Sequence, residues 1–315
     1  MEYSKNVKCN YFTNGIDEQP GDQPIRVFYN LIEADFNGIR ESLSKLKPSY
    51  NFENVRLEYL TENIKVIGPS TNGQKITIHD TFLSFLWSYI YGIVVLTPFG
   101  DKELTKEENE EARILIKYAQ GLMTNYTYWD KEIMPNPEIF GKDSKRFIGV
   151  TNAVFLCSVQ FILFHEFAHI FLEHTLVPNA LRTPNNIKKM EIDADNVAIG
   201  WALQSFEDDF TGKIALISAL NSLSFFPQKF SDSLTHPAPE DRIRMCLERL
   251  SIDDNDFIWG YATYSIMEWQ VYNELFYLLQ SSKKEENFKV KFYKMISELK
   301  EFKKTGKTII KNNTN

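Results

Sequence analysis

His165-Glu166-Phe167-Ala168-His169 is the stretch that decides the fold and the chemistry of this chain. An α-helix advances about 100° per residue, so His165 and His169 lie one above the other on one helical face. Glu166 lies about 100° round from His165, at the edge of that face. Two neutral imidazoles placed in this way can ligate one Zn²⁺, while the neighbouring carboxylate is free to take a proton from a water molecule. The stretch therefore predicts a zinc-binding helix.

The residues on either side of this stretch are mostly apolar, which separates it from an accidental match. They are Val154, Phe155, Leu156, Val159, Phe161, Ile162, Leu163 and Phe164 before it and Ile170, Phe171 and Leu172 after it. A helix with such neighbours lies in a core, where an unpaired charge costs several kcal/mol. A bound metal compensates for this cost. The alternative is a structural cluster in which the polar side chains satisfy one another.

A third ligand is needed, because a catalytic zinc site normally has three protein ligands and leaves the fourth position to water. Residues 176–186 are rich in proline and asparagine, which predicts a loop that reverses the chain. The residues from Lys188 onward predict a new helix, on which Glu191 and Asp195 share one face and Asp193 points to the other side. Glu191 is thus favoured as the third ligand. Asp195 is placed to hold the free ring nitrogen of a ligand histidine.

The two segments together resemble the glutamate-zincin pattern, a histidine-glutamate-x-x-histidine helix followed by Glu-x-x-Ala-Asp. More narrowly, the chain resembles the Lit family of bacterial phage-exclusion peptidases. The matching stretches are residues 164–174, 191–195 and 235–243, in the same order, and the resemblance covers about residues 80 to 250. It implies a zincin-like fold, a Zn²⁺ cofactor held by His165, His169 and Glu191, and Glu166 as the general base of peptide hydrolysis.

Two interpretations of His236 remain open. By the resemblance, its side chain donates a hydrogen bond to the oxyanion that forms during hydrolysis. Alternatively, the His-Pro-Ala-Pro stretch is a rigid turn before a helix at 240–250, with Arg242 pairing with a buried carboxylate such as Asp195. His174 follows His169 by five residues, so on a continuing helix it points about 140° away and is not expected to be a ligand.

The resemblance implies a substrate as well, namely translation elongation factor Tu, cleaved during phage infection. A peptidase in the cytoplasm must be restrained, so we expect a particular target or a phage-derived activator to open the site. Two alternatives remain. One is a regulatory peptidase that cleaves a repressor or an antitoxin, and the other is a non-catalytic, zinc-containing sensor or binding module.

Composition predicts an ordered protein in a reducing compartment. The chain has 315 residues, of which 43% are hydrophobic and 14% aromatic, enough for a full core. Three cysteines without paired spacing, and an N-terminus without an apolar segment, predict the cytoplasm. A net charge of −7 with no basic block argues against nucleic acid as a partner. Residues 82–99 hold 18 uncharged residues, which we interpret as a buried core helix, with a membrane segment as the alternative.

The predicted fold class is α+β and zincin-like, mainly helical, with a small N-terminal antiparallel sheet and the metal-binding helix in the core. The sheet is expected from residues 55–60, 64–67 and 75–78, which alternate apolar with polar side chains. The predicted divisions are a loosely ordered segment 1–23, one peptidase domain 24–302 and a disordered tail 303–315. Within the domain we expect an α/β lobe at 24–147 and a helical lobe with the metal site at 148–302.

Overall fold

The computed structural model describes residues 23–97, 103–139, 146–206, 209–226, 234–272 and 287–305. Residues 1–22 of the predicted N-terminal segment and 306–315 of the predicted tail lie outside the described residues. Residues 303–305 belong instead to the last helix, α9 (Phe288–Thr305), so the predicted start of the tail is wrong. The cause is a contact with a distant residue: Lys303 Nζ lies 2.6 Å from the buried carboxylate of Glu240, and this ion pair holds the last turn of α9.

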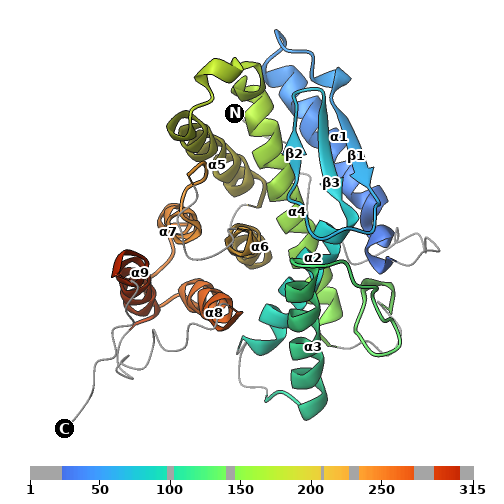
Figure 1. Ribbon diagram of the computed structural model, residues 1–315, viewed down its shortest axis with the longest axis vertical. Helices are drawn as coiled ribbons and strands as arrows, with labels where there is room; N and C mark the ends of the chain where they lie inside the picture. The colour runs from blue at the N-terminus through green and yellow to red at the C-terminus, as the bar shows by residue number, and fades with distance from the viewer. Residues whose placement is uncertain are drawn as a thin grey trace.

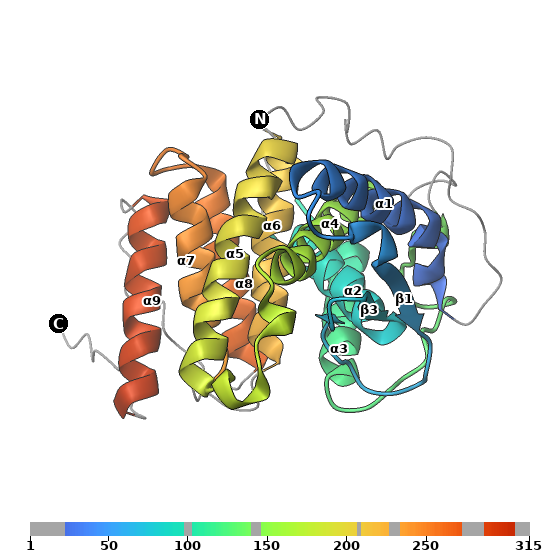
Figure 2. The same ribbon diagram turned by 90° about the horizontal axis from the view of Figure 1, so that it is seen from above.

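The central element is α4 (Ile148–Phe171), the helix that carries His165 and His169. Seen from above, α4 is viewed almost end-on between two groups of elements (Figure 2). One group holds α1, α2, α3 and the sheet, and the other holds α5 to α9. A helix that is apolar on all sides is buried on all sides. Among the described helices, α4 alone is long and apolar enough to cross a membrane. Of its apolar 18-residue stretch, 83% is buried within the protein.

Two helices of the N-terminal half pack against α4, and a third packs against the second of them. They are α1 (Tyr29–Leu46), preceded by the 3₁₀ turn Pro24–Phe28, α2 (Asp80–Leu96) and α3 (Lys106–Leu122). Every residue of α2 from Asp80 to Val95 is buried, as predicted for a core helix. The start of α3 is fixed by a capping box in which Thr105 and Glu108 satisfy each other's backbone N–H groups. Gly92 of α2 faces Ile116 of α3 without room for a Cβ atom, so these two helices lie very close.

The sheet has three strands, β1 (Arg56–Leu60), β2 (Ser70–Thr71) and β3 (Lys75–His79), in the order β1-β3-β2. The predicted all-antiparallel arrangement is wrong, because β1 pairs with β3 in parallel and only β2 and β3 are antiparallel. The segment 64–67 is not a strand: Val66 N donates to Leu122 O at the end of α3, which draws the segment away from the sheet. Only the turn at Gly73, with φ of 91°, closes a hairpin.

The C-terminal half consists of helices, as predicted. They are α5 (Pro184–Phe206), α6 (Phe210–Ser222), α7 (Pro239–Arg249), α8 (Phe257–Tyr272) and α9. Figure 1 shows α5 and α6 beside α4, with α7, α8 and α9 farther out. Short 3₁₀ turns at His174–Leu176 and Asn179–Leu181 connect α4 to α5 and reverse the chain. The molecule is thus mainly helical with a small mixed sheet, in agreement with the predicted α+β class.

Candidate metal centre

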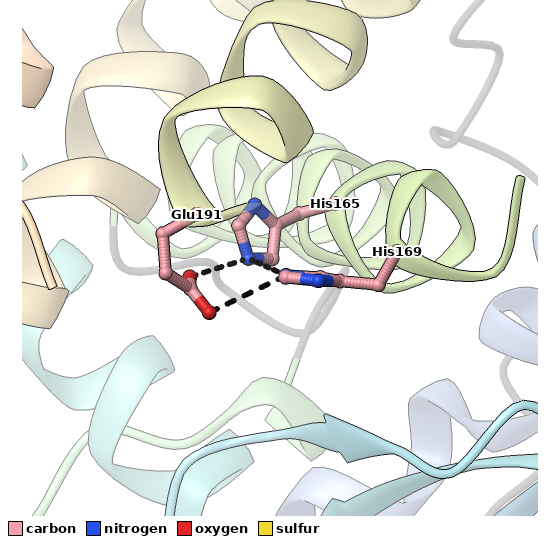
Figure 3. Close-up of side chains that lie close together, drawn as sticks. All are labelled: His165, His169 and Glu191. Carbon is pink, nitrogen blue, oxygen red and sulfur yellow. Dashed lines mark hydrogen bonds and ion pairs between the residues drawn. The ribbon is translucent and has the colours of Figure 1, made fainter. Parts of the chain in front are cut away.

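Three side chains from two helices converge at one point (Figure 3). His165 and His169 come from α4 and Glu191 comes from α5. The two histidine Nε2 atoms are 3.1 Å apart, and they lie 3.3 Å and 3.5 Å from the two Glu191 carboxylate oxygens. Two ligands bound at about 2.1 Å in a tetrahedral arrangement lie roughly 3.3–3.4 Å apart. The nitrogen and oxygen donors therefore fit a single ion of the size and preference of Zn²⁺.

The site is open on one side. Each of the three side chains is 13–14% exposed, and all three line a cavity of about 520 Å³. Structural zinc sites are closed by four protein ligands, often cysteines. Among the described residues the candidate group has three members, and Cys157 and Cys246 are buried elsewhere. Three ligands beside a cavity would leave the fourth coordination position of a bound ion open to a small molecule.

Glu166 lines the same cavity and is 8% exposed. Burial raises the pKa of its carboxyl, although the imidazoles of His165 and His169 oppose this effect. A carboxylate whose pKa is raised takes up a proton more readily, which is what a general base must do. The helix therefore presents two ligands and one proton acceptor to a single cavity.

Asp195 and Arg242 lie directly behind His165. The Asp195 Oδ1 atom is 3.0 Å from His165 Nδ1, and Arg242 donates two hydrogen bonds of 2.6 Å to the same carboxylate. Burial alone would raise the pKa of Asp195, but the Arg242 guanidinium and His165 hold it below its usual value. The carboxylate is thus charged and fixes the ring of His165 with Nε2 toward Glu191.

His236 lies at the edge of the site. Its Nε2 atom is 3.8 Å from Glu191 Oε1, and 52% of its side chain is exposed. The two interpretations of its segment are compatible in the structure, because Arg242 pairs with Asp195 while His236 faces the cavity.

The pKa of the Glu191 carboxyl is lowered despite burial, because His165 and His169 contact its carboxylate.

His174 does not point away from the site as the sequence suggests. Glu173 adopts φ of 60°, which ends α4 and turns the chain back, and the His174 ring is buried against His169. The two Nδ1 atoms are 3.1 Å apart. Burial lowers the pKa of His174 to about 4, so its ring is neutral. Counting helical angles missed this residue because the helix ends before it.

The sequence did not show which residues form the cavity walls. Strand β2, an edge of the sheet, forms one wall with Ser70 and Thr71. Apolar side chains cover other parts of the wall, namely Phe161, Ile162, Met190, Leu223 and Phe226. The apolar residues of α4 appear in the sequence as ordinary core positions, and Phe226 is distant from the motif. Only the fold shows that they surround the same space.

Comparisons with known proteins show which family the chain belongs to. A family model described as Peptidase U49 matches residues 76–262, which is more than half of the chain. The chain belongs to the Peptidase U49 family. The Peptidase U49 region runs from β3 into α8 and includes the three candidate ligands, Glu166, Asp195, His236 and Arg242, whereas strand β2 lies before it.

A curated relative of this Peptidase U49 chain is the cell death peptidase of Escherichia coli (strain K12). It is 26% identical over 263 residues, which cover 75% of this chain and 85% of the relative. No solved structure matches the chain significantly. The family and the relative support the resemblance to Lit-like peptidases and a role as a peptidase, that is, a hydrolase of peptide bonds.

Proposed function

We propose that this member of the Peptidase U49 family is a zinc-dependent endopeptidase of the gluzincin type. The observation that carries the proposal is the convergence of His165, His169 and Glu191 at ligand spacing, with Glu166 in the same cavity. His165, His169 and Glu191 would hold Zn²⁺. When bound there, the ion would supply a Lewis acid that lowers the pKa of water and polarises a carbonyl group.

The side chains around the ion perform the proton transfers in this proposal. Glu166 accepts a proton from the attacking water and delivers it to the amine that leaves. His236, which lines the cavity, donates a hydrogen bond to the oxyanion of the substrate. The Asp195 carboxylate, which pairs with Arg242, keeps the His165 ring in the required tautomer and orientation.

Strand β2 supplies a place for the substrate backbone. It pairs with β3 on one side and lines the cavity on the other, so its outer edge can pair with an extended peptide. Main-chain pairing of this kind aligns a peptide without reading its sequence. An extended segment bound along β2 would pass the centre of the metal site, which favours cleavage within a chain.

For the cellular role, we propose cleavage of translation elongation factor Tu in the cytoplasm during phage infection, triggered by a phage-derived activator. The support for this proposal is the resemblance of three sequence stretches to the Lit family and the relative's name, cell death peptidase. A repressor or an antitoxin as the substrate would use the same site. The substrate therefore needs an experiment that does not assume it.

The test compares proteins cleaved in cells that express the wild type or Glu166→Gln. Glu166→Gln keeps the shape of the side chain and all three ligands but removes the proton acceptor. We expect the variant to bind one equivalent of zinc and to produce none of the wild-type cleavage products, detected as new protein termini by mass spectrometry. Glu110→Gln, on the exposed face of α3, is the matched control and should cleave like the wild type. Normal cleavage by Glu166→Gln would refute the mechanism.

A further inference from the structure

We infer that His174 is a positioning residue that orients the ligand His169 by accepting a hydrogen bond from its Nδ1–H group. The inference rests on the metal site of the proposed function. Its basis is geometric: the two Nδ1 atoms are 3.1 Å apart, and the ring centroids are 5.1 Å apart at an interplanar angle of 68°. A distance of 3.1 Å between ring nitrogens is that of a hydrogen bond, which needs one donor and one acceptor.

The direction of this bond follows from the other nitrogen of His169. Its Nε2 atom faces His165 and Glu191, so a metal ligand must keep the Nε2 lone pair free. The ring proton of His169 is then on Nδ1 and points at His174. His174 must accept it, which leaves the proton of His174 on its own Nε2 atom.

The fold holds His174 in place by several independent contacts. Glu173 keeps a left-handed backbone that a non-glycine residue adopts at a cost, and such strain gathers at functional positions. Lys47 Nζ donates to Phe171 O at the end of α4 and contacts Glu173, while Arg182 donates to His174 O. The residue after His174, Thr175, lies so close to the turn at Gly73 that a Cβ atom on Gly73 would not fit beside its side chain. A helix connection without a further role would not need to be so constrained.

The two ligand histidines thus receive different partners. The Nδ1 atom of His165 contacts the charged carboxylate of Asp195, which forms an ion pair with Arg242. The Nδ1 atom of His169 instead contacts the neutral imidazole of His174. A ligand histidine is usually oriented by a carboxylate, a backbone carbonyl or water, and losing that partner typically lowers metal affinity by about 10–100-fold. His174 performs the same task for His169 without adding a charge beside the ion.

The test measures zinc affinity by competition with a chromogenic chelator. His174→Phe keeps an aromatic ring but removes the acceptor, and we expect it to bind zinc about 10–100-fold more weakly. His174→Asn places an amide oxygen at the δ position and should restore affinity to within about threefold of the wild type. Leu176→Ala, an exposed residue of the same 3₁₀ turn, is the matched control and should bind zinc normally. Thermal unfolding of the zinc-free proteins shows that each variant is folded.

A second readout does not depend on a variant. The chain has five histidines, so labelling them with nitrogen-15 gives a simple spectrum. In the zinc-loaded wild type we expect a proton on His169 Nδ1 and an unprotonated His174 Nδ1 coupled to it. A protonated His174 Nδ1, or equal zinc affinity for His174→Phe and the wild type, would overturn the inference alone. A wild-type protein that binds no zinc would overturn the proposed function as well.

Discussion

Arg242 and Asp195 are 47 residues apart in the sequence and form a two-point ion pair that is almost completely buried. The Asp195 carboxylate also contacts His165, so one acidic side chain joins α4, α5 and α7. Because α7 begins just after His236, the same pair fixes the position of the segment that carries this residue. The arrangement of the metal site therefore depends on an ion pair between two residues that are not themselves candidate ligands.

Replacing Arg242 by Met should destabilise the protein strongly. The change leaves the Asp195 carboxylate buried without its partner, and removing one member of a buried pair typically costs about 3–5 kcal/mol. The free energy of unfolding of the zinc-free protein, measured in urea, is the appropriate quantity. Arg244→Met, two residues along the same helix, removes only solvent-exposed pairs with Asp241 and Glu248 and should cost less than about 1 kcal/mol. Equal effects of the two changes would contradict this account.

Zinc should stabilise the folded protein, and a chelator should remove this added stability. A ligand that binds only the folded state contributes about 2.7 kcal/mol at a free concentration of 100 times its dissociation constant. We expect the melting temperature of the wild type to fall when a chelator is added and to recover with added zinc. His165→Ala lacks a ligand, so its melting temperature should not respond to either addition. A response of His165→Ala equal to that of the wild type would show that zinc binds elsewhere.

Gly92→Ala should separate α2 from α3. A Cβ atom at this position would overlap Cγ1 of Ile116 and lie 3.1 Å from the carbonyl oxygen of Ala112. Overpacking of this kind typically costs about 1–3 kcal/mol in the free energy of unfolding. Gly121→Ala, where nothing lies within 4 Å, should instead stabilise the protein by up to about 1 kcal/mol, because alanine favours the helix. Adding Ile116→Ala to Gly92→Ala should recover part of the loss.

Cys246 should resist alkylation in the folded protein. Burial raises the pKa of its thiol to about 12, and only the thiolate reacts with iodoacetamide. At pH 8 the thiolate fraction is then about one in ten thousand. We expect peptide mapping by mass spectrometry to find Cys246 unmodified in native protein and fully modified in urea. Modification at the same rate in both conditions would mean that α7 opens readily.

The candidate ligands could be predicted because their relation is local. The spacing of His165 and His169 fixes their geometry on any helix, and the face shared by Glu191 and Asp195 follows from the same periodicity. The core position of α2 follows from a long uncharged segment. In each case a short window of sequence holds the information that determines the structure.

The features that were missed depend on distant contacts or on a single backbone angle. The chain between the parallel strands β1 and β3 contacts the end of α3 through Val66, and no alternation pattern encodes this contact. The position of His174 depends on one left-handed residue, Glu173, that is neither glycine nor asparagine. The last turn of α9 includes Lys303, whose partner Glu240 is buried in another helix, α7.

The burial of α4 has a consequence for synthesis of the protein on the ribosome. Its early neighbours, α1 and α2, precede it in the chain, but α5 and α6 are made after it. Translation from the end of α4 at Phe171 to the end of α6 at Ser222 takes roughly 3–10 s at about 5–20 residues per second. During this interval one side of an apolar segment long enough to resemble a membrane span is uncovered. The nascent chain thus presents a binding site for chaperones that the finished protein does not have.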